Sequence, residues 1–221
     1  MSQSRPENWQ EASLLYSHLV SLGHYFPLNL WASSYQVREE LEPFRDHWKP
    51  YNPQKPGFKR WGLSVTSLDG GFSGDPDLTS LFEVNEQRGT SYDEKSFRQL
   101  TSIYEKCPLV RSLVEPFLPF LGRAHFLKFD SGGFFPYHRD AYSIGGDTFR
   151  IFVPFVEGNS RDFIFLLGTE RIQLEPGRAY FINTRMEHAL FSFDDNSLHL
   201  VLNVDLSPES VQAVCRKVFS R

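Results

Sequence analysis

Apolar and polar positions along the chain follow two different periods, and the helical period dominates the first part. Asn8 to Leu22 carries leucines on one helical stripe, and Ser34 to Trp48 carries a second stripe that a proline bends or splits. Helical patterns return over residues 93–104 and 109–121. We therefore expect residues 1–57 to be mostly helical, with further helices inserted before the run of strands that begins near residue 123.

From Arg123 onward, short β-type runs follow one another, separated by turn signals at roughly ten-residue intervals. An earlier run from Arg60 to Leu68 alternates in the same way and predicts a leading strand. Pro208 to Phe219 has the pattern of a closing helix. The later runs are RAHFLKF, FRIFVPF, FIFLL, RIQL, RAYFIN, HALFSF and LHLVLNVDL.

Many short strands at even spacing, preceded by helices, predict an α+β protein. We expect a double-stranded β-helix (a cupin-like jelly roll) with N-terminal helices packed against its outside. The 221 residues suit one domain over 1–221. Within it, residues 58–206 would form the β-helix core, with inserted helices over 93–121, and 207–221 would form a C-terminal helix. The 21 phenylalanines suit a sheet-based core.

Composition narrows the class of protein. The net charge of −4 provides no basic footprint, which argues against nucleic acid as a partner. Cys107 and Cys215 are far apart and form no CxxC pair, so a reducing compartment is the default expectation. The N-terminus MSQSRPENWQ lacks the pattern of a secretory signal, and no run is long enough to span a membrane. We expect a cytoplasmic protein with no membrane partner.

A histidine and an aspartate one residue apart follow the Gly-rich segment DSGGFFPY. In extended chain, His138 and Asp140 would face the same side, which suits two ligands of one metal. His188, which opens HALFSF, is the best candidate for a third ligand. Two imidazoles and a carboxylate form the facial triad of non-haem Fe(II) oxygenases. The alternative is that His138 is a turn histidine bonded to Asp140, and His188 a strand histidine satisfied by backbone.

A keto acid co-substrate would also need a partner for its far carboxylate, because an unpaired buried carboxylate is costly. Arg150 lies among apolar residues in FRIFVPF and is the first candidate; alternatively it is a strand-end arginine that reaches solvent. His199 in LHLVLNVDL is the second candidate, with a core histidine as the alternative. Lys128 and Asn183 could also line the cavity, whereas Arg123 is expected to be solvated.

The segment from about residue 123 to 206 resembles the aspartyl/asparaginyl β-hydroxylase and proline 3-hydroxylase group of 2-oxoglutarate oxygenases. The matching stretches are RAHFLKFDSGGFFPYHRD, FRIFVPF, LEPGRAYFINTRMEHAL and LHLVLNVDL. The resemblance implies Fe(II), 2-oxoglutarate and O₂, with a small-molecule or peptide substrate. It also implies that His138, Asp140 and His188 are the metal ligands, and that Arg150 contacts co-substrate or substrate. Loops such as AYSIGGDT (residues 141–148) are candidates to cover the substrate.

The chain departs from that group at one place. Where the group has an arginine that grips the far carboxylate, this chain has His199, which offers less charge and a shorter reach. Either Arg150 takes over, or His199 binds as imidazolium, or the co-substrate is not ordinary 2-oxoglutarate. The rival functions are a non-catalytic cupin-like module that binds a metal or small molecule, a Zn²⁺ or Mn²⁺ isomerase or hydrolase, and an interaction protein with a decayed site.

Overall fold

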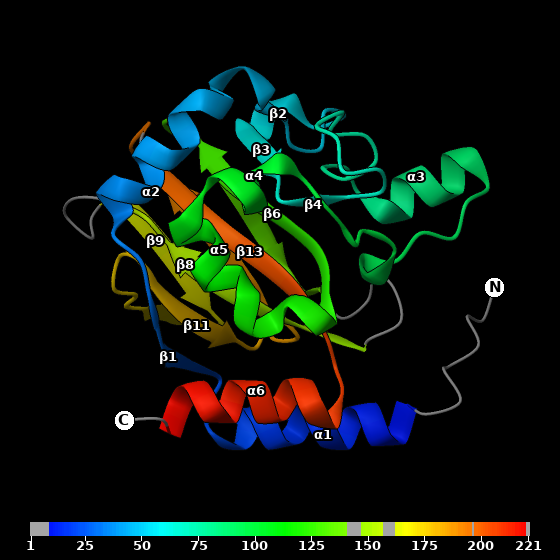
Figure 1. The fold of residues 1–221 in the computed structure, drawn as a ribbon, viewed down its shortest axis with the longest axis vertical. Coiled ribbons are helices and arrows are strands. Elements are labelled where there is room, and N and C mark those ends of the chain that lie inside the picture. The colour runs from blue at the N-terminus through cyan, green and yellow to red at the C-terminus, as the bar shows by residue number, and fades with distance from the viewer. Residues whose placement is uncertain (1–8, 141–146, 157–161, 196, 220–221) are drawn as a thin grey trace.

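The computed structural model of the chain describes residues 9–140, 147–156, 162–195 and 197–219. Two antiparallel sheets form the centre of the molecule (Figure 1), and the protein is an α+β double-stranded β-helix. The larger sheet has the order β1 (Tyr25–Trp31), β11 (Arg178–Ile182), β8 (Thr148–Pro154), β13 (Ser197–Asp205), β6 (Leu121–Phe129), β3 (Arg60–Ser64) and β2 (Lys49–Pro50). The smaller sheet has the order β10 (Glu170–Ile172), β9 (Phe163–Leu167), β12 (His188–Ser192) and β7 (Phe134–His138). A separate pair joins β4 (Thr66–Ser67) and β5 (Gln99–Leu100).

Helices cover the outer face of the larger sheet and one end of the molecule. In Figure 1, α4 and α5 lie across β6 and β13, while α1 and α6 lie side by side at the end near β1. No helix in the described part of the chain has both the length and the apolar character to cross a bilayer. The helices are α1 (Trp9–Ser21), α2 (Ser34–Leu41), α3 (Leu81–Arg88), α4 (Ser102–Lys106), α5 (Pro108–Val114) and α6 (Pro208–Phe219), with 3-10 turns η1 (Glu42–His47), η2 (Pro56–Phe58), η3 (Glu94–Ser96) and η4 (Glu115–Phe120).

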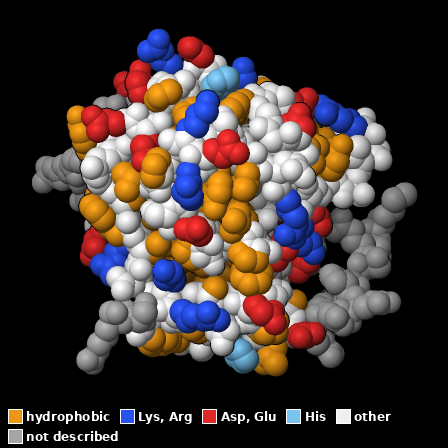
Figure 2. All heavy atoms as spheres, viewed as in Figure 1, with side chains coloured by type: hydrophobic (Ala, Val, Ile, Leu, Met, Phe, Trp, Pro, Cys, Tyr) orange, Lys and Arg blue, Asp and Glu red, His pale blue; other side chains and the backbone are white. Residues whose placement is uncertain are grey.

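The side chains of β13 alternate between two apolar clusters, one on each face of the larger sheet. Leu198, Leu200 and Leu202 face the covering helices and belong to the larger apolar cluster. Val201 faces the space between the sheets, where a second cluster of leucines, isoleucines and phenylalanines packs. Because side chains alternate, His199 also points into the space between the sheets. On the face shown in Figure 2, acidic and basic side chains are interspersed rather than gathered by sign.

The N-terminal part contains a strand that the hydrophobic pattern did not predict. β1 (YFPLNLW) buries Phe26 and Leu28 and pairs with β11, 150 or so residues away in the chain. The run contains Pro27, which is tolerated because β1 is an edge strand, where a missing N–H costs little. Long-range pairing, which local sequence cannot report, decides its conformation.

The other helical predictions were confirmed in part. The second stripe splits where Pro43 lies, with α2 ending at Leu41 and a 3-10 turn following. The helix predicted over residues 93–104 is wrong: η3, β5 and the start of α4 share that segment. Asp93 caps η3, and the Thr101 N–H donates to the Val65 carbonyl, so non-local pairing breaks the helical pattern. Helix α3 was not predicted.

The chain segments next to β1 and β11 approach so closely at Gly177 that a larger residue does not fit there. Gly177 has φ +80°, and a Cβ there would lie 2.0 Å from the Ala32 carbonyl oxygen. Gly177→Ala should therefore lower the free energy of unfolding by about 3 kcal/mol or more, because backbone must move as well as adopt a strained φ. Gly89→Ala is the control: its φ is +65° with no atom within 4 Å, so only strain of about 1 kcal/mol applies. Equal losses in urea unfolding would contradict this account.

Candidate metal centre and its pockets

Two histidines face each other across adjacent antiparallel strands. His138 ends β7 and His188 begins β12, and the two are register partners. Their ring centroids lie 4.2 Å apart. Directly opposed residues on neighbouring strands have the closest Cβ atoms in a sheet, which explains why two residues 50 positions apart meet here.

Asp140 completes the cluster from the chain just beyond β7. Its backbone N–H donates to the Thr184 carbonyl oxygen at 3.0 Å, which ties this segment to the turn before β12. Its Oδ1 lies 3.5 Å from His138 Nε2, and its Oδ2 lies 3.7 Å from His188 Nε2. One possible ligand atom from each of the three residues lies within 4.8 Å of the others. The structure therefore brings together the three residues predicted as ligands.

Backbone carbonyls hold both imidazole rings in one tautomer. His138 Nδ1 lies 2.7 Å from the Pro136 oxygen, and His188 Nδ1 lies 3.0 Å from the Met186 oxygen. A carbonyl oxygen only accepts, so in each neutral ring Nδ1 carries the hydrogen and Nε2 keeps its lone pair. Both lone pairs are on the atoms nearest Asp140. A donated Nδ1–H is the usual support of a metal-ligating histidine.

Charges around Asp140 keep it ionised. Burial by itself would raise its pKa, but Arg150, with Nη1 3.0 Å from Oδ2, holds the pKa well below its usual range. Burial lowers the pKa of His188, so that imidazole is neutral at neutral pH. A carboxylate and two imidazoles form a donor set that fits a divalent transition metal, and the two-His, one-carboxylate combination is that of non-haem Fe(II) sites.

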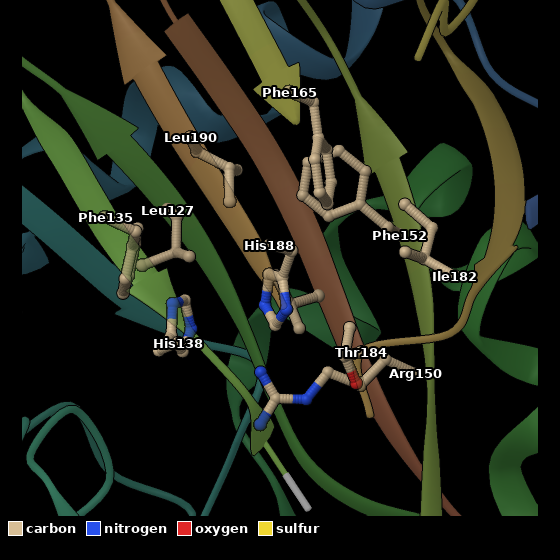
Figure 3. A pocket seen from close by; sticks show the side chains of 11 residues that line it. Leu127, Phe135, His138, Arg150, Phe152, Phe165, Ile182, Thr184, His188 and Leu190 are labelled. Atoms are coloured by element: carbon tan, nitrogen blue, oxygen red, sulfur yellow. The ribbon is translucent and has the colours of Figure 1, made fainter. Parts of the chain in front are cut away.

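The cluster lies between two pockets of different character. The inner pocket lies between the sheets and is mainly apolar (Figure 3). There, the Arg150 guanidinium lies toward the two imidazoles, with Phe152 and Phe165 on the opposite side. The outer pocket is larger and more polar than the inner one, with which it shares His138 and Arg150. The inner pocket is lined by Leu127, Phe135, His138, Arg150, Phe152, Phe165, Ile182, Thr184, His188, Leu190 and Val201.

Arg150 lies at the cluster, where acidic side chains already pair with its guanidinium. Besides its ion pair with Asp140, its Nη2 lies 3.6 Å from Glu94 Oε1. Its guanidinium is thus directed at the acids of the site, although the side chain is still 21% exposed. Its charge is already balanced by acids of the site.

His199 lies deeper between the sheets and lines neither pocket that contains the cluster. Its ring packs against Phe163, Phe152 and Phe129, with centroids 4.4, 5.1 and 5.7 Å away. Burial, with a smaller effect of Arg38, lowers its pKa to about 3. A neutral imidazole in an aromatic setting does not fit the expectation that His199 binds a carboxylate as imidazolium.

Two other predicted residues do not reach the cluster. Lys128 is exposed, because alternation along β6 turns it away from the inner face that carries Leu127. Asn183 accepts a hydrogen bond from the Tyr16 hydroxyl at 2.8 Å, and its amide nitrogen lies 3.0 Å from His24 Nδ1. It thus joins α1 to β11 rather than lining the cavity.

The outer pocket contains residues that the sequence did not identify. Arg123, expected to be solvated, is 5% exposed and forms a bidentate ion pair with Glu94 at 2.7 and 2.8 Å. The alternation of RAHFLKF could have placed Arg123 and His125 on the inner face. The sequence did not indicate Glu94 as a site residue, because its segment has a helical pattern. Arg60 also lies in this pocket. Residues 141–146 of the candidate substrate loop lie outside the described residues.

No protein-family model matches the chain, and no curated protein matches it in sequence. A Burkholderia pseudomallei oxidoreductase of the 2OG-Fe(II) oxygenase family is 10% identical, with 94% of each chain covered and a TM-score of 0.46. A Pseudomonas putida prolyl-4-hydroxylase is 12% identical, over 89% of this chain and 98% of the other, with a TM-score of 0.46. KdgF from Halomonas sp. is 24% identical, over 41% and 74%, with a TM-score of 0.31. These likenesses are too distant to indicate function, so the site is interpreted from its own geometry.

The buried His199 predicts a specific pH dependence of stability. Its pKa is about 3 when folded and about 6.5 when unfolded, so only the unfolded chain gains a proton as pH falls from 6.5. Stability is therefore lost as pH decreases through this window. We expect the free energy of unfolding, measured in urea, to fall between pH 7.5 and pH 5.0 by about 2 kcal/mol less in His199→Phe than in the wild type. The variant His18→Phe, at an exposed site, should show the same decrease as the wild type. An identical decrease in the free energy of unfolding in all three proteins would contradict the role given to His199.

Proposed function

We propose that this protein is an Fe(II)-dependent oxygenase that uses 2-oxoglutarate and O₂ to hydroxylate an amino acid, a protein side chain or a related small molecule. The observation that carries the proposal is the convergence of His138, His188 and Asp140 with both Nε2 lone pairs available. Two neutral imidazoles and one carboxylate leave a divalent metal with open positions for other ligands. When bound there, a ferrous ion would supply oxygen activation together with a keto acid.

The surrounding residues have distinct roles in this proposal. The carbonyls of Pro136 and Met186 orient the two imidazoles, and Arg150 keeps Asp140 ionised and in position. The apolar side chains of the inner pocket exclude water from the reacting centre, which protects it from side reactions.

The far carboxylate of the keto acid needs a cation that is not already neutralised. Arg150 is the only cationic side chain among the described residues that line the inner pocket, and its charge is shared by Asp140 and Glu94. The inner pocket therefore does not fit a dicarboxylate held in the way the family resemblance implies. The outer pocket, with its larger number of cationic side chains, fits an anion better.

The main competing function is a non-catalytic cupin-like module that binds a metal or small molecule. An Arg150 side chain that pointed away from the metal cavity would favour the binding module. Arg150 lines the cavity and pairs with Asp140, so this feature does not favour the binding module. Glutamate, a frequent fourth ligand of cupin-type Zn²⁺ or Mn²⁺ enzymes, is absent from the described ligand cluster.

A direct spectroscopic test uses the purified protein with Fe(II) and 2-oxoglutarate without oxygen. A weak visible charge-transfer band should appear, because the keto acid chelates the metal through its ketone and adjacent carboxylate. Admitting air should then release succinate. Absence of both the band and succinate, in protein shown to bind iron, would leave the binding-module function in its place.

A variant of the third ligand tests the metal centre itself. His188→Ala removes one of three donors, so Fe(II) retention after gel filtration should fall by more than about tenfold. The circular dichroism spectrum should be unchanged, since the substitution removes a polar ring rather than apolar core. His18→Ala, which removes an exposed imidazole on α1, is the matched control and should retain iron. Equal iron content in the two variants would exclude His188 as a ligand.

A further inference from the structure

Arg60 is a buried cation in the same pocket as the candidate metal ligands. It begins β3, next to β6 in the larger sheet, and is 6% exposed. It lines the outer pocket together with His138 and Asp140. Arginine at this depth normally has a carboxylate partner, because burying an unpaired charge is expensive.

Aromatic rings surround its guanidinium. The guanidinium carbon lies 4.0 Å from the Phe135 ring centroid, 4.7 Å from that of Phe58 and 5.3 Å from that of Tyr51. Such contacts stabilise a buried cation but do not supply the oxygen acceptors that its N–H groups can bind. Within the described chain, no carboxylate lies at ion-pair distance from Arg60, and its Nε has no hydrogen-bond acceptor.

The balance of charge in the pocket leaves Arg60 in excess. Arg123 and Arg150 share Glu94, and Arg150 also pairs with Asp140. The remaining lining cation, Lys55, pairs with Glu83 at 2.7 Å. Burial lowers the pKa of Arg60 to about 10, which still leaves it charged at neutral pH. The pocket therefore lacks one anion, and a bound metal would add further positive charge.

The distance from Arg60 to the cluster suits a short acid. Phe135 contacts both, with its ring centroid 4.0 Å from the Arg60 guanidinium carbon and 5.7 Å from the His138 ring centroid. The two steps together limit the separation of Arg60 from that imidazole to at most about 9.7 Å. A chain of a few carbons can connect a group at the ligand cluster with a carboxylate at Arg60.

We propose that Arg60 is the carboxylate anchor of this site: it binds, through its N–H edge, the far carboxylate of a small acid whose other end lies at His138, Asp140 and His188. The inference rests on the proposed function. The acid is either the keto acid co-substrate or an acidic substrate, and both supply the same group to Arg60. A bidentate guanidinium–carboxylate pair would also provide the buried cation with the partner that the chain lacks.

The first experiment needs neither iron nor turnover. Succinate added to metal-free protein should raise the melting temperature, since it binds the folded state only. Its apparent affinity should fall at least about tenfold in Arg60→Gln and partly recover in Arg60→Lys. Lys59→Gln removes one positive charge from an exposed neighbouring side chain that does not line the pocket, and it should behave as wild type. Equal succinate affinity in Arg60→Gln and wild type would overturn the anchor.

The second experiment identifies the source of the carboxylate. Anaerobic Fe(II)-loaded protein is titrated with 2-oxoglutarate and with 2-oxopentanoate, which has the same carbon chain but no far carboxylate. If Arg60 holds the co-substrate, the wild type prefers 2-oxoglutarate by at least about tenfold and Arg60→Gln loses that preference. If Arg60 holds the substrate, the preference persists, and Arg60→Gln instead loses the binding preference for acidic amino acids over their amides.

The two proposals can fail separately. Iron-loaded wild type that binds neither keto acid would contradict the oxygenase function, while the succinate effect in metal-free protein would still support Arg60 as an anion site. Conversely, tight 2-oxoglutarate binding that Arg60→Gln leaves unchanged, with no loss for any acidic amino acid, would contradict the anchor and leave the oxygenase function intact.

Discussion

The pairing of β7 with β12 is the contact on which the site depends. It sets His138 opposite His188, and the backbone two residues before each histidine supplies the carbonyl that holds the ring. Because each carbonyl lies in the same segment as its ligand, the local backbone fixes the tautomer. Asp140 then needs only one further backbone bond, to Thr184, to reach both imidazoles.

A chain of ion pairs connects this cluster with a part of the protein outside the β-helix. Asp140 pairs with Arg150, Arg150 approaches Glu94, and Glu94 forms a bidentate pair with Arg123. Glu94 belongs to η3, which approaches β6 so closely that a Cβ on Gly122 would lie 2.5 Å from the Glu94 carbonyl oxygen. The glycine therefore allows the insertion to bring its acid to the site. Removing one partner of such a buried network leaves an uncompensated charge, which makes the network a unit rather than a set of independent contacts.

The two pockets differ in polarity, and therefore in the groups that each can bind. The inner pocket is bounded by leucines, isoleucine and phenylalanines and has little to offer a charged group beyond the triad. The outer pocket holds the cations, of which Arg60 alone has no acid among the described residues. His199, where the sequence resemblance implied an arginine, is a neutral ring among phenylalanines. The carboxylate anchor that we propose therefore lies on β3 and not on β13, from which β6 separates it in the sheet.

The sequence alone determined the elements whose signals are local. Alternation after residue 123 predicted the strands and the fold class, and the HxD spacing with a later histidine predicted the three residues that the structure brings together. The tertiary structure alone decided the rest. β1 forms because β11 offers it an edge, and Arg123 is buried because Glu94 reaches it. Arg60 is singled out by the aromatic rings of other segments around it and by the lack of an acid at ion-pair distance among the described residues. Periodicity reports which way a side chain faces relative to its own strand. Which partner it meets there depends on long-range packing, to which no local pattern has access.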